Sequence, residues 1–559
     1  MATTVLSAGR AEQQSPTASK ASYVPLAVLA LAQIGTSSDG AAMNLATASL
    51  VGSLGATLDD IQVATALFSL IAGAFMIAGG LIGVTIGLRR GLATGLAMAL
   101  IGELIAALSP NIAVFTWGGR VVMALGACLV TPAVLGLVAA LYQGRQRAIA
   151  FGTIAGAAAL STLSPLALGA VMDQAGFRLT FAIMTVYFAI VLCCTRLVPA
   201  TPPAGKHARF DVAGTAVAAL GLGLALLGVS HLSDWGILAP QKLCPFTVFG
   251  MAPTLPAIVV GLLLLGLLVP TERRAERRGN PLIPTAFVTS KGVRAGLAAV
   301  FVPFFYMGAV GILATPYLQL VTGFTALQTG LLSLLSGIPM FLLATFLPKL
   351  APHLSSRLII RVGFIALACA CALMALGVQQ HGVTLPLFLG MALGGFGVGA
   401  VNSQANNAVA CSVNREEAEQ SGGIQGAARS IGLALGTALA GTCLLLTMAG
   451  GFTTLATEGG VQHDLMAAAT DQASTLMSDD AFDALTGQWG ADADQAAKLV
   501  EAKSAAQSNA MRLTFGALGC VVLLSLLTTR NLVETAVPKK PKSAGSSQKA
   551  KRADSAARA

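Results

Sequence analysis

The segment YVPLAVLALAQIGTSSDGAAMNLATASL, Tyr23 to Leu50, has the length and composition of a helix that crosses a membrane. At 1.5 Å per residue, such a helix can span the roughly 30 Å of a hydrocarbon core. The segment nevertheless contains an aspartate, Asp39, with no basic residue nearby in the sequence. A carboxylate at this depth is costly unless it is paired, hydrated or protonated, so Asp39 indicates a transport pathway or a coupling site.

The rest of the chain repeats this apolar character. Its 559 residues are 55% hydrophobic and 10% charged, whereas soluble proteins carry about 25% charged residues. Apolar runs of about 18 to 25 residues recur along nearly the whole length, and each can cross a bilayer as a helix. The sequence therefore predicts an all-α polytopic membrane protein.

No constellation of a soluble enzyme competes with this interpretation. The sequence contains no Walker-type phosphate loop, and its five histidines are scattered without metal-ligand spacing. We therefore expect a protein that is not an enzyme, with no cofactor and no metal, and with an energy source other than ATP.

The apolar runs predict both the number of spans and their orientation. An even number of spans places both termini on one side, where most of the Lys and Arg then fall, Arg147 and Arg429 among them. The positive-inside rule makes this the cytoplasmic side. The net charge of +10 is explained by this topology and needs no nucleic-acid partner. The fourteen predicted spans are 23–50, 59–83, 91–109, 112–138, 149–171, 179–199, 211–230, 246–270, 295–318, 326–347, 359–378, 384–410, 422–446 and 510–529.

Three ionisable residues fall well within the predicted spans: Asp39, Glu103 and Arg120. Counted from the ends of their spans, all three can lie in one layer of the membrane. A pair formed by Asp39 and Arg120 would offset the cost of burying each charge and could couple proton movement to a conformational change. Two alternatives stay open: Asp39 as a structural hydrogen-bond partner of a neighbouring helix, and Glu103 as a partly hydrated residue near the outer surface.

Other residues within the spans are candidates for a substrate pathway. Pro165 interrupts the hydrogen-bond ladder of the span 149–171. Asn402 and Asn406, near the cytoplasmic end of the span 384–410, line either an inner water-filled mouth or a frayed helix end. Phe305 and Tyr306 belong to an aromatic cluster that serves either packing and lipid contact or the binding of cargo.

Several segments resemble the fourteen-span drug:proton antiporter family of the major facilitator superfamily. The span 23–50 has the Asp and Asn of that family's first helix, at Asp39 and Asn44, and the family's fourth-helix pattern is partly retained at Arg120 and Val121. Further matches are Gly126, Ala127, Pro132, Gly176–Phe181, Arg209–Gly214, Ser233–Gly236, Tyr317–Phe324 and Asn414–Ala418. The chain departs from the family at Val84, where the family has a gating aspartate, and at the weakened helix-5 motif that contains Pro165.

The resemblance implies the major facilitator fold, with two six-helix bundles and two inserted helices among 14 transmembrane helices. The implied parts are a tail at 1–22, a first bundle at 23–199, inserted helices and a linker at 200–294, a second bundle at 295–529 with an outside loop at 447–509, and a basic tail at 530–559. The family also implies proton coupling, with Asp39 as the proton carrier and Arg120 as its modulator, and we expect Glu103 to be a third proton-coupling residue. The predicted substrate pathway includes Asn44, Pro165, Phe305, Tyr306, Gln319, Asn402 and Asn406.

The expected function is proton-coupled export of hydrophobic, cationic small molecules across the plasma membrane by alternating access. The expected partners are the substrate, protons and the lipid bilayer, and the expected state is a monomer with both termini in the cytoplasm. One alternative is a dedicated exporter of an endogenous metabolite or lipid-like molecule without proton coupling. Another is a membrane sensor or scaffold that does not transport.

Overall fold

The computed structural model describes residues 22–56, 58–201, 212–231, 235–236, 238, 240, 244, 246–277, 290–324, 326–351, 353–379, 384–413, 415–473 and 476–532. Within these residues the regular structure is helical, apart from isolated bridge residues at Val248, Met251 and Val378. The predicted N-terminal tail before Ser22 and the basic tail after Leu532 lie outside the described residues.

The first bundle is formed by six apolar segments that pack around their own core. Its core includes Leu29, Val134 and Phe188, all fully buried. The helices are α1 (Val24–Leu54), α2 (Leu58–Ile86), α3 (Leu88–Leu108), η1 (Val114–Arg120), α4 (Val121–Leu141), α5 (Gly144–Leu160), η2 (Ser161–Leu163) and α6 (Ser164–Cys194).

The two predicted spans 149–171 and 179–199 are divided differently in the structure. A short 3-10 turn, η2, follows α5, and α6 then continues to a kink at Gly176, where φ is 72°. A positive φ of this size is easily adopted only by glycine. The first span is thus α5, η2 and the start of α6, and the second span is the part of α6 after Gly176.

Two inserted helices separate the bundles along the chain. These helices, α7 (Val212–Ser230) and α9 (Thr254–Arg277), pack against each other, and α7 also packs against α2. Gly221 and Gly261 make this contact close: a Cβ at Gly261 would lie 2.5 Å from the backbone nitrogen of Ala225.

The second bundle has a separate hydrophobic core that includes Phe364, Val401 and Met448. Its helices are α11 (Lys291–Pro316), η4 (Tyr317–Val321), α12 (Ala326–Leu350), α13 (Ser356–Gly377), α14 (Leu385–Ala410), α15 (Arg415–Glu458), α18 (Ala493–Ser525) and η6 (Leu526–Asn531).

Each of the fourteen predicted spans overlaps a helical segment, and the predicted fold class is confirmed. Ten helices within the described residues are long and apolar enough to cross a membrane. Shorter apolar helices occur at Ala216–Val229 and Thr254–Leu268. The number of fourteen spans agrees with this arrangement and stays a prediction.

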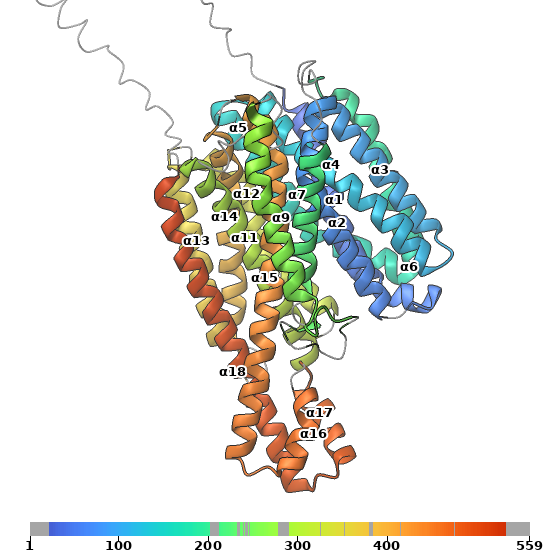
Figure 1. The fold of residues 1–559 in the computed structure, drawn as a ribbon, viewed down its shortest axis with the longest axis vertical. Helices are drawn as coiled ribbons and strands as arrows, with labels where there is room; N and C mark the ends of the chain where they lie inside the picture. Colours follow the sequence, from blue (N-terminus) through green and yellow to red (C-terminus); the bar gives the residue numbers. More distant parts are fainter. Residues whose placement is uncertain are drawn as a thin grey trace, which may run out of the picture.

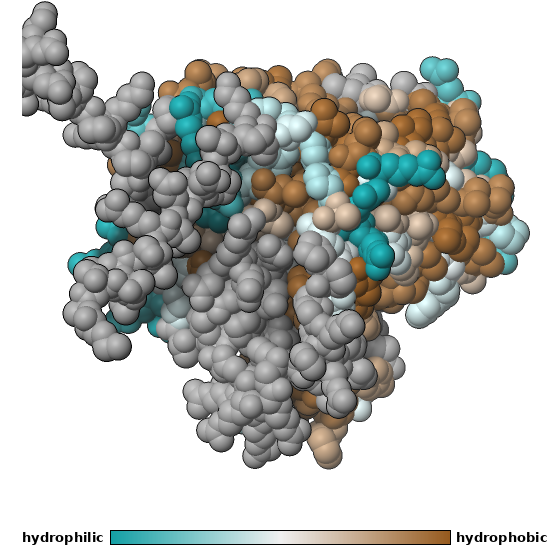
Figure 2. Space-filling view, turned by 90° about the horizontal axis from the view of Figure 1, so that it is seen from above, coloured by the Kyte–Doolittle hydropathy of each residue, from teal (hydrophilic) through white to brown (hydrophobic). Residues whose placement is uncertain are grey.

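Exposed apolar side chains cover the outside of the bundles, as expected for a protein surrounded by lipid tails. Large hydrophobic side chains such as Leu104, Ile190, Leu263 and Leu342 are exposed. Figure 2, which views the molecule from above, shows hydrophobic residues predominating over the part of this face that is coloured.

The two bundles meet on the side where α1 begins and η6 ends, and they diverge toward the opposite side (Figure 1). Small residues permit the close approach. A Cβ at Gly152 of α5 would lie 2.6 Å from the carbonyl oxygen of Ala344 on α12, and a Cβ at Gly80 of α2 would lie 2.8 Å from the Cα of Gly423 on α15. The described structure is therefore closed on the side of the termini.

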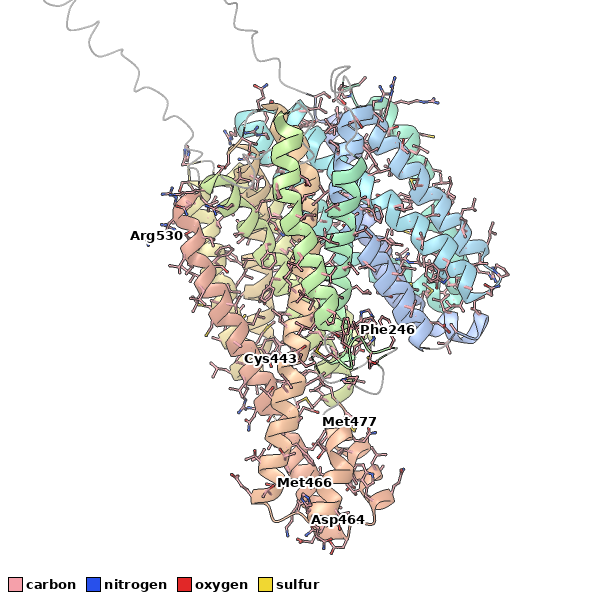
Figure 3. All side chains as sticks on the ribbon, viewed as in Figure 1. Phe246, Cys443, Asp464, Met466, Met477 and Arg530 are labelled. Carbon is pink, nitrogen blue, oxygen red and sulfur yellow. The ribbon has the colours of Figure 1, made fainter. Side chains whose placement is uncertain are left out.

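The segment 447–509 is a small helical domain at the far end of the molecule. It contains the end of α15, α16 (His463–Ala473), α17 (Asp479–Thr486), η5 (Gly487–Trp489) and the start of α18. Phe452, Phe482 and Leu499 are fully buried in its core. Figure 3 shows Met466 and Met477 in this domain, at the end of the molecule opposite to Arg530.

Candidate functional site

Asp39 and Arg120 form a buried ion pair inside the first bundle. The guanidinium of Arg120 donates to both carboxylate oxygens of Asp39, over 2.5 Å to Oδ1 and 2.9 Å to Oδ2. Asp39 is 0% exposed and Arg120 is 2% exposed. The contact expected from their similar depth is therefore present, between α1 and the end of η1.

Glu103 on α3 adds a second carboxyl group to this pair. It is 1% exposed and lies beside the carboxylate of Asp39. Neither oxygen of Glu103 receives a hydrogen bond within the described part of the chain. Two carboxylates and one guanidinium carry a net negative charge when all are ionised, so one proton on the carboxyl groups makes the group of three neutral.

Small residues place these side chains together. The helices α3 and α4 cross so closely that a Cβ at Gly102 would lie 2.6 Å from the backbone nitrogen of Met123. A Cβ at Gly119 would lie 3.0 Å from Ala106. Gly102 and Gly119 directly precede Glu103 and Arg120, so this approach brings the carboxyl group and the guanidinium into one layer.

Two further features fix Arg120. It ends the π-helical turn η1, and such turns are often found at functional sites because they change the register of the helix. The ring of Phe68 on α2 lies 4.6 Å from the guanidinium carbon. Four helices of the first bundle therefore contribute to the site.

The predicted pathway residues of the second bundle lie apart from this site. Phe305 and Tyr306 are 7% and 4% exposed and belong to the core of the second bundle, so they do not line an open route in this conformation. Gln319 is exposed in η4. Pro165 belongs to the first turn of α6, and Asn44 to α1, but neither side chain is among those described.

The amides of α14 are buried, not frayed. The helix continues to Ala410, and Asn402 and Asn406 are 5% and 1% exposed. Asn406 accepts a hydrogen bond from Arg429 on α15 over 3.0 Å. In this closed arrangement both amides are buried, Asn406 binds Arg429, and neither amide lines an inner mouth.

Sequence reasoning missed a polar contact between the two bundles. Arg147 of α5 donates to Oδ1 of Asn407 over 3.2 Å and to Sγ of Cys411 over 2.8 Å, both at the end of α14. The topology rule had already accounted for Arg147 and Arg429 as basic residues near one side of the membrane, so neither was assigned a site.

The comparisons with known proteins agree with this architecture. Residues 28–437 match the family model described as Major Facilitator Superfamily. The chain is 25% identical over 467 residues to the probable actinorhodin transporter of Streptomyces coelicolor. The aligned region covers 82% of this chain and 78% of that protein. It is 26% identical over 410 residues to the multidrug resistance protein Stp of Mycobacterium tuberculosis, with 73% of each covered.

Solved structures share the fold at lower identity. The proton:xylose symporter XylE bound to 6-bromo-6-deoxy-D-glucose superposes with a TM-score of 0.56 at 12% identity, covering 92% of this chain and 96% of that one. The human organic anion transporter MFSD10 gives a TM-score of 0.55 at 16% identity, covering 90% and 97%. Since the family model matches most of the chain and these structures share its helical architecture, the chain belongs to the Major Facilitator Superfamily of membrane transporters.

Proposed function

We propose that this transporter exports hydrophobic small molecules across the plasma membrane in exchange for protons. The observation that carries the proposal is the buried group of Asp39, Arg120 and Glu103. The names of two relatives, a multidrug resistance protein and a probable actinorhodin transporter, support small-molecule cargo.

The coupling follows from the cost of burying charge. With one proton on the two carboxyl groups, the three side chains are neutral in sum and can stay dry inside the bundle. Without that proton, a negative charge is left in a low-dielectric interior, which favours a conformation that admits water. Proton binding thus stabilises one arrangement of the bundles, and proton release favours the other.

The closed side carries Ser22 and Leu532, where the described part of the chain begins and ends. We place this side in the cytoplasm, because the predicted topology assigns most basic residues of the sequence to it. The described conformation would then face outward, which is the state that takes up a proton and releases cargo.

The experiment uses purified protein in proteoliposomes with an imposed pH gradient. Uptake of a panel of cationic, neutral and anionic amphipathic compounds is measured for the wild type and for Asp39→Asn. We expect uptake driven by the gradient in the wild type and none in the variant. Asp483→Asn, which removes a carboxylate of the outer domain, is the control and should behave like the wild type. Unchanged pH-driven uptake by folded Asp39→Asn would overturn the proposal.

A second candidate is an exporter of an endogenous metabolite without proton coupling. It is favoured by Val84, which is buried at the position where the resembled family has a gating aspartate. Gradient-independent uptake of a compound by both the wild type and Asp39→Asn would support this candidate.

A further inference from the structure

Arg429 is an arginine at membrane depth that forms no ion pair with an acidic residue in the part of the chain that the structure describes. It lies eight residues after Ser421, where the apolar part of α15 begins, which is about 12 Å along the helix axis. Its guanidinium donates to Oδ1 of Asn406 over 3.0 Å. Its Nε has no hydrogen-bond partner within the described residues.

The sequence places no acidic residue in the membrane-embedded parts of the helices that pack against α15 around Arg429. No aspartate or glutamate occurs in 291–414, in 420–457 or in 502–531, which contain nearly all the membrane-embedded part of the second bundle. Glu419 precedes Arg429 by ten residues on the same helix, or about 15 Å. The helices α2, from Ile61 onward, and α4 carry no acidic residue either. Arg120, by contrast, forms an ion pair with Asp39.

The position of Arg429 on α15 places it at the seam between the bundles. Neighbouring positions on the same helix contact the first bundle: a Cβ at Gly426 would lie 2.5 Å from the side chain of Met76, and Ser430 lies opposite Gly73. Gly432 instead contacts α11, where a Cβ would lie 2.6 Å from the carbonyl oxygen of Phe301. Arg429 lies between these two faces and is neither fully buried nor fully exposed.

An aromatic surface adjoins the guanidinium. The ring of Phe304 lies 5.3 Å from the guanidinium carbon, and Phe301 stacks on Phe305 with 5.7 Å between the ring centroids. Phe301 and Phe304 are partly exposed, whereas Phe305 is buried. A ligand that contacts both the guanidinium of Arg429 and these phenylalanine rings would need an apolar or aromatic body and a negatively charged hydrogen-bond acceptor.

We infer that Arg429 binds an anionic group of the cargo, so that the substrates include amphipathic organic anions, and this inference rests on the proposed export function. A carboxylate, sulfonate or phenolate of the cargo would supply the negative charge that pairs with the guanidinium of Arg429. Asn406 would hold that guanidinium in place. This charge preference is opposite to the cationic cargo expected from the sequence. The carboxyl groups that could attract a cation, Asp39 and Glu103, are enclosed with Arg120.

Three probes of similar size and different charge test the inference: 1-naphthylacetate, 2-(1-naphthyl)ethanol and 2-(1-naphthyl)ethylamine. Binding to the purified full-length transporter is measured by equilibrium dialysis, and transport is measured in proteoliposomes. A charge-assisted hydrogen bond predicts that the wild type binds the anion about 10- to 100-fold more tightly than the alcohol. Arg429→Gln should lose this preference, and Arg429→Lys should keep part of it.

The matched control is Arg361→Gln, which removes a partly exposed arginine of the same bundle that binds Thr529. It should retain the preference of the wild type for the anion. A wild type that binds the anion no better than the alcohol, or an Arg429→Gln variant with undiminished preference, would overturn the inference. Failure of the proposed export function would be seen in a different measurement. In that case no probe would show gradient-driven uptake that depends on Asp39, whatever the order of the binding affinities.

Discussion

Arg147 of α5 and Asn407 of α14 join the two bundles through a hydrogen bond of 3.2 Å on the side of the termini. The same guanidinium also donates to Cys411. In the resembled family a loop aspartate is expected at this side, where the present chain has Val84. Arg147 therefore supplies a polar contact between the bundles that does not depend on that aspartate.

Replacing Arg147 by Gln should loosen the closed side. We expect Cys411 to react several-fold faster with a maleimide added from the cytoplasmic side, because its thiol loses the covering guanidinium. The measurement is the rate of labelling in a variant whose other cysteines are replaced. Arg89→Gln is the control, because Arg89 binds the carbonyl of Arg196 within the first bundle. Equal labelling rates in all three proteins would show that Arg147 does not hold this side closed.

Gly152→Ala should weaken the contact between α5 and α12. The added Cβ would lie 2.6 Å from the carbonyl oxygen of Ala344, and overpacking of this kind costs about 1–3 kcal/mol. The measurement is the midpoint of thermal unfolding in detergent. In Gly311→Ala, where nothing lies within 4 Å of the new Cβ, the midpoint should stay or rise, because alanine favours a helix by up to about 1 kcal/mol over glycine. A midpoint for Gly152→Ala at or above that of the wild type would contradict the packing argument.

The sequence predicted the helical architecture because apolar runs of membrane length are a strong signal. It also predicted the contact of Asp39 with Arg120, since two opposite charges at similar depth have few other partners. The segment 447–509 was predicted as an outside loop with some helix, but its hydrophobic core around Phe452 and Phe482 was not predicted, because α16 and α17 are short and polar. The kink at Gly176 could not be located either, since its positive φ depends on tertiary contacts.

The roles of arginines were the least predictable feature of the sequence. Topology rules explain a basic residue near the cytoplasmic side without requiring a partner, so Arg147 and Arg429 gave no separate signal. Only the positions of Asn406, Asn407 and Phe304 beside them show which of these side chains has a specific environment.

Glu103→Gln should abolish proton release induced by cargo, even though Asp39 is still present. In this variant the Asp39–Arg120 pair is neutral without a bound proton, so no proton is needed for charge balance. Under the proposed function, the wild type should release on the order of one proton per protein when cargo binds. The measurement is the pH change of a weakly buffered solution of purified protein. Glu103→Asp should retain part of the release. Full release by Glu103→Gln would assign Glu103 a purely structural role.

The outer domain should become more stable as the pH rises toward 10.5, because of Lys503. This residue precedes the predicted span 510–529; it is 0% exposed and donates to the carbonyl of Met477 and, over 3.3 Å, to Asp479. Burial lowers the pKa of the Lys503 ammonium from its ordinary 10.5, although the Asp479 carboxylate opposes this shift. Between the lowered pKa and 10.5 the unfolded domain binds more protons than the folded one, so stability increases with pH in that window.

Hydrogen-exchange protection of residues 447–509 measures this effect, after correction for the intrinsic exchange rates at each pH. We expect protection to increase in the wild type as the pH rises toward 10.5, and Lys503→Met to lose that increase because it has no titrating group at this position. Lys498→Met is the matched control: Lys498 is exposed and pairs with Asp494 on the domain surface, so the increase should persist. The segment contains no tyrosine or cysteine that titrates in the same range. An increase that survives in Lys503→Met would therefore assign the pH dependence to groups outside the domain.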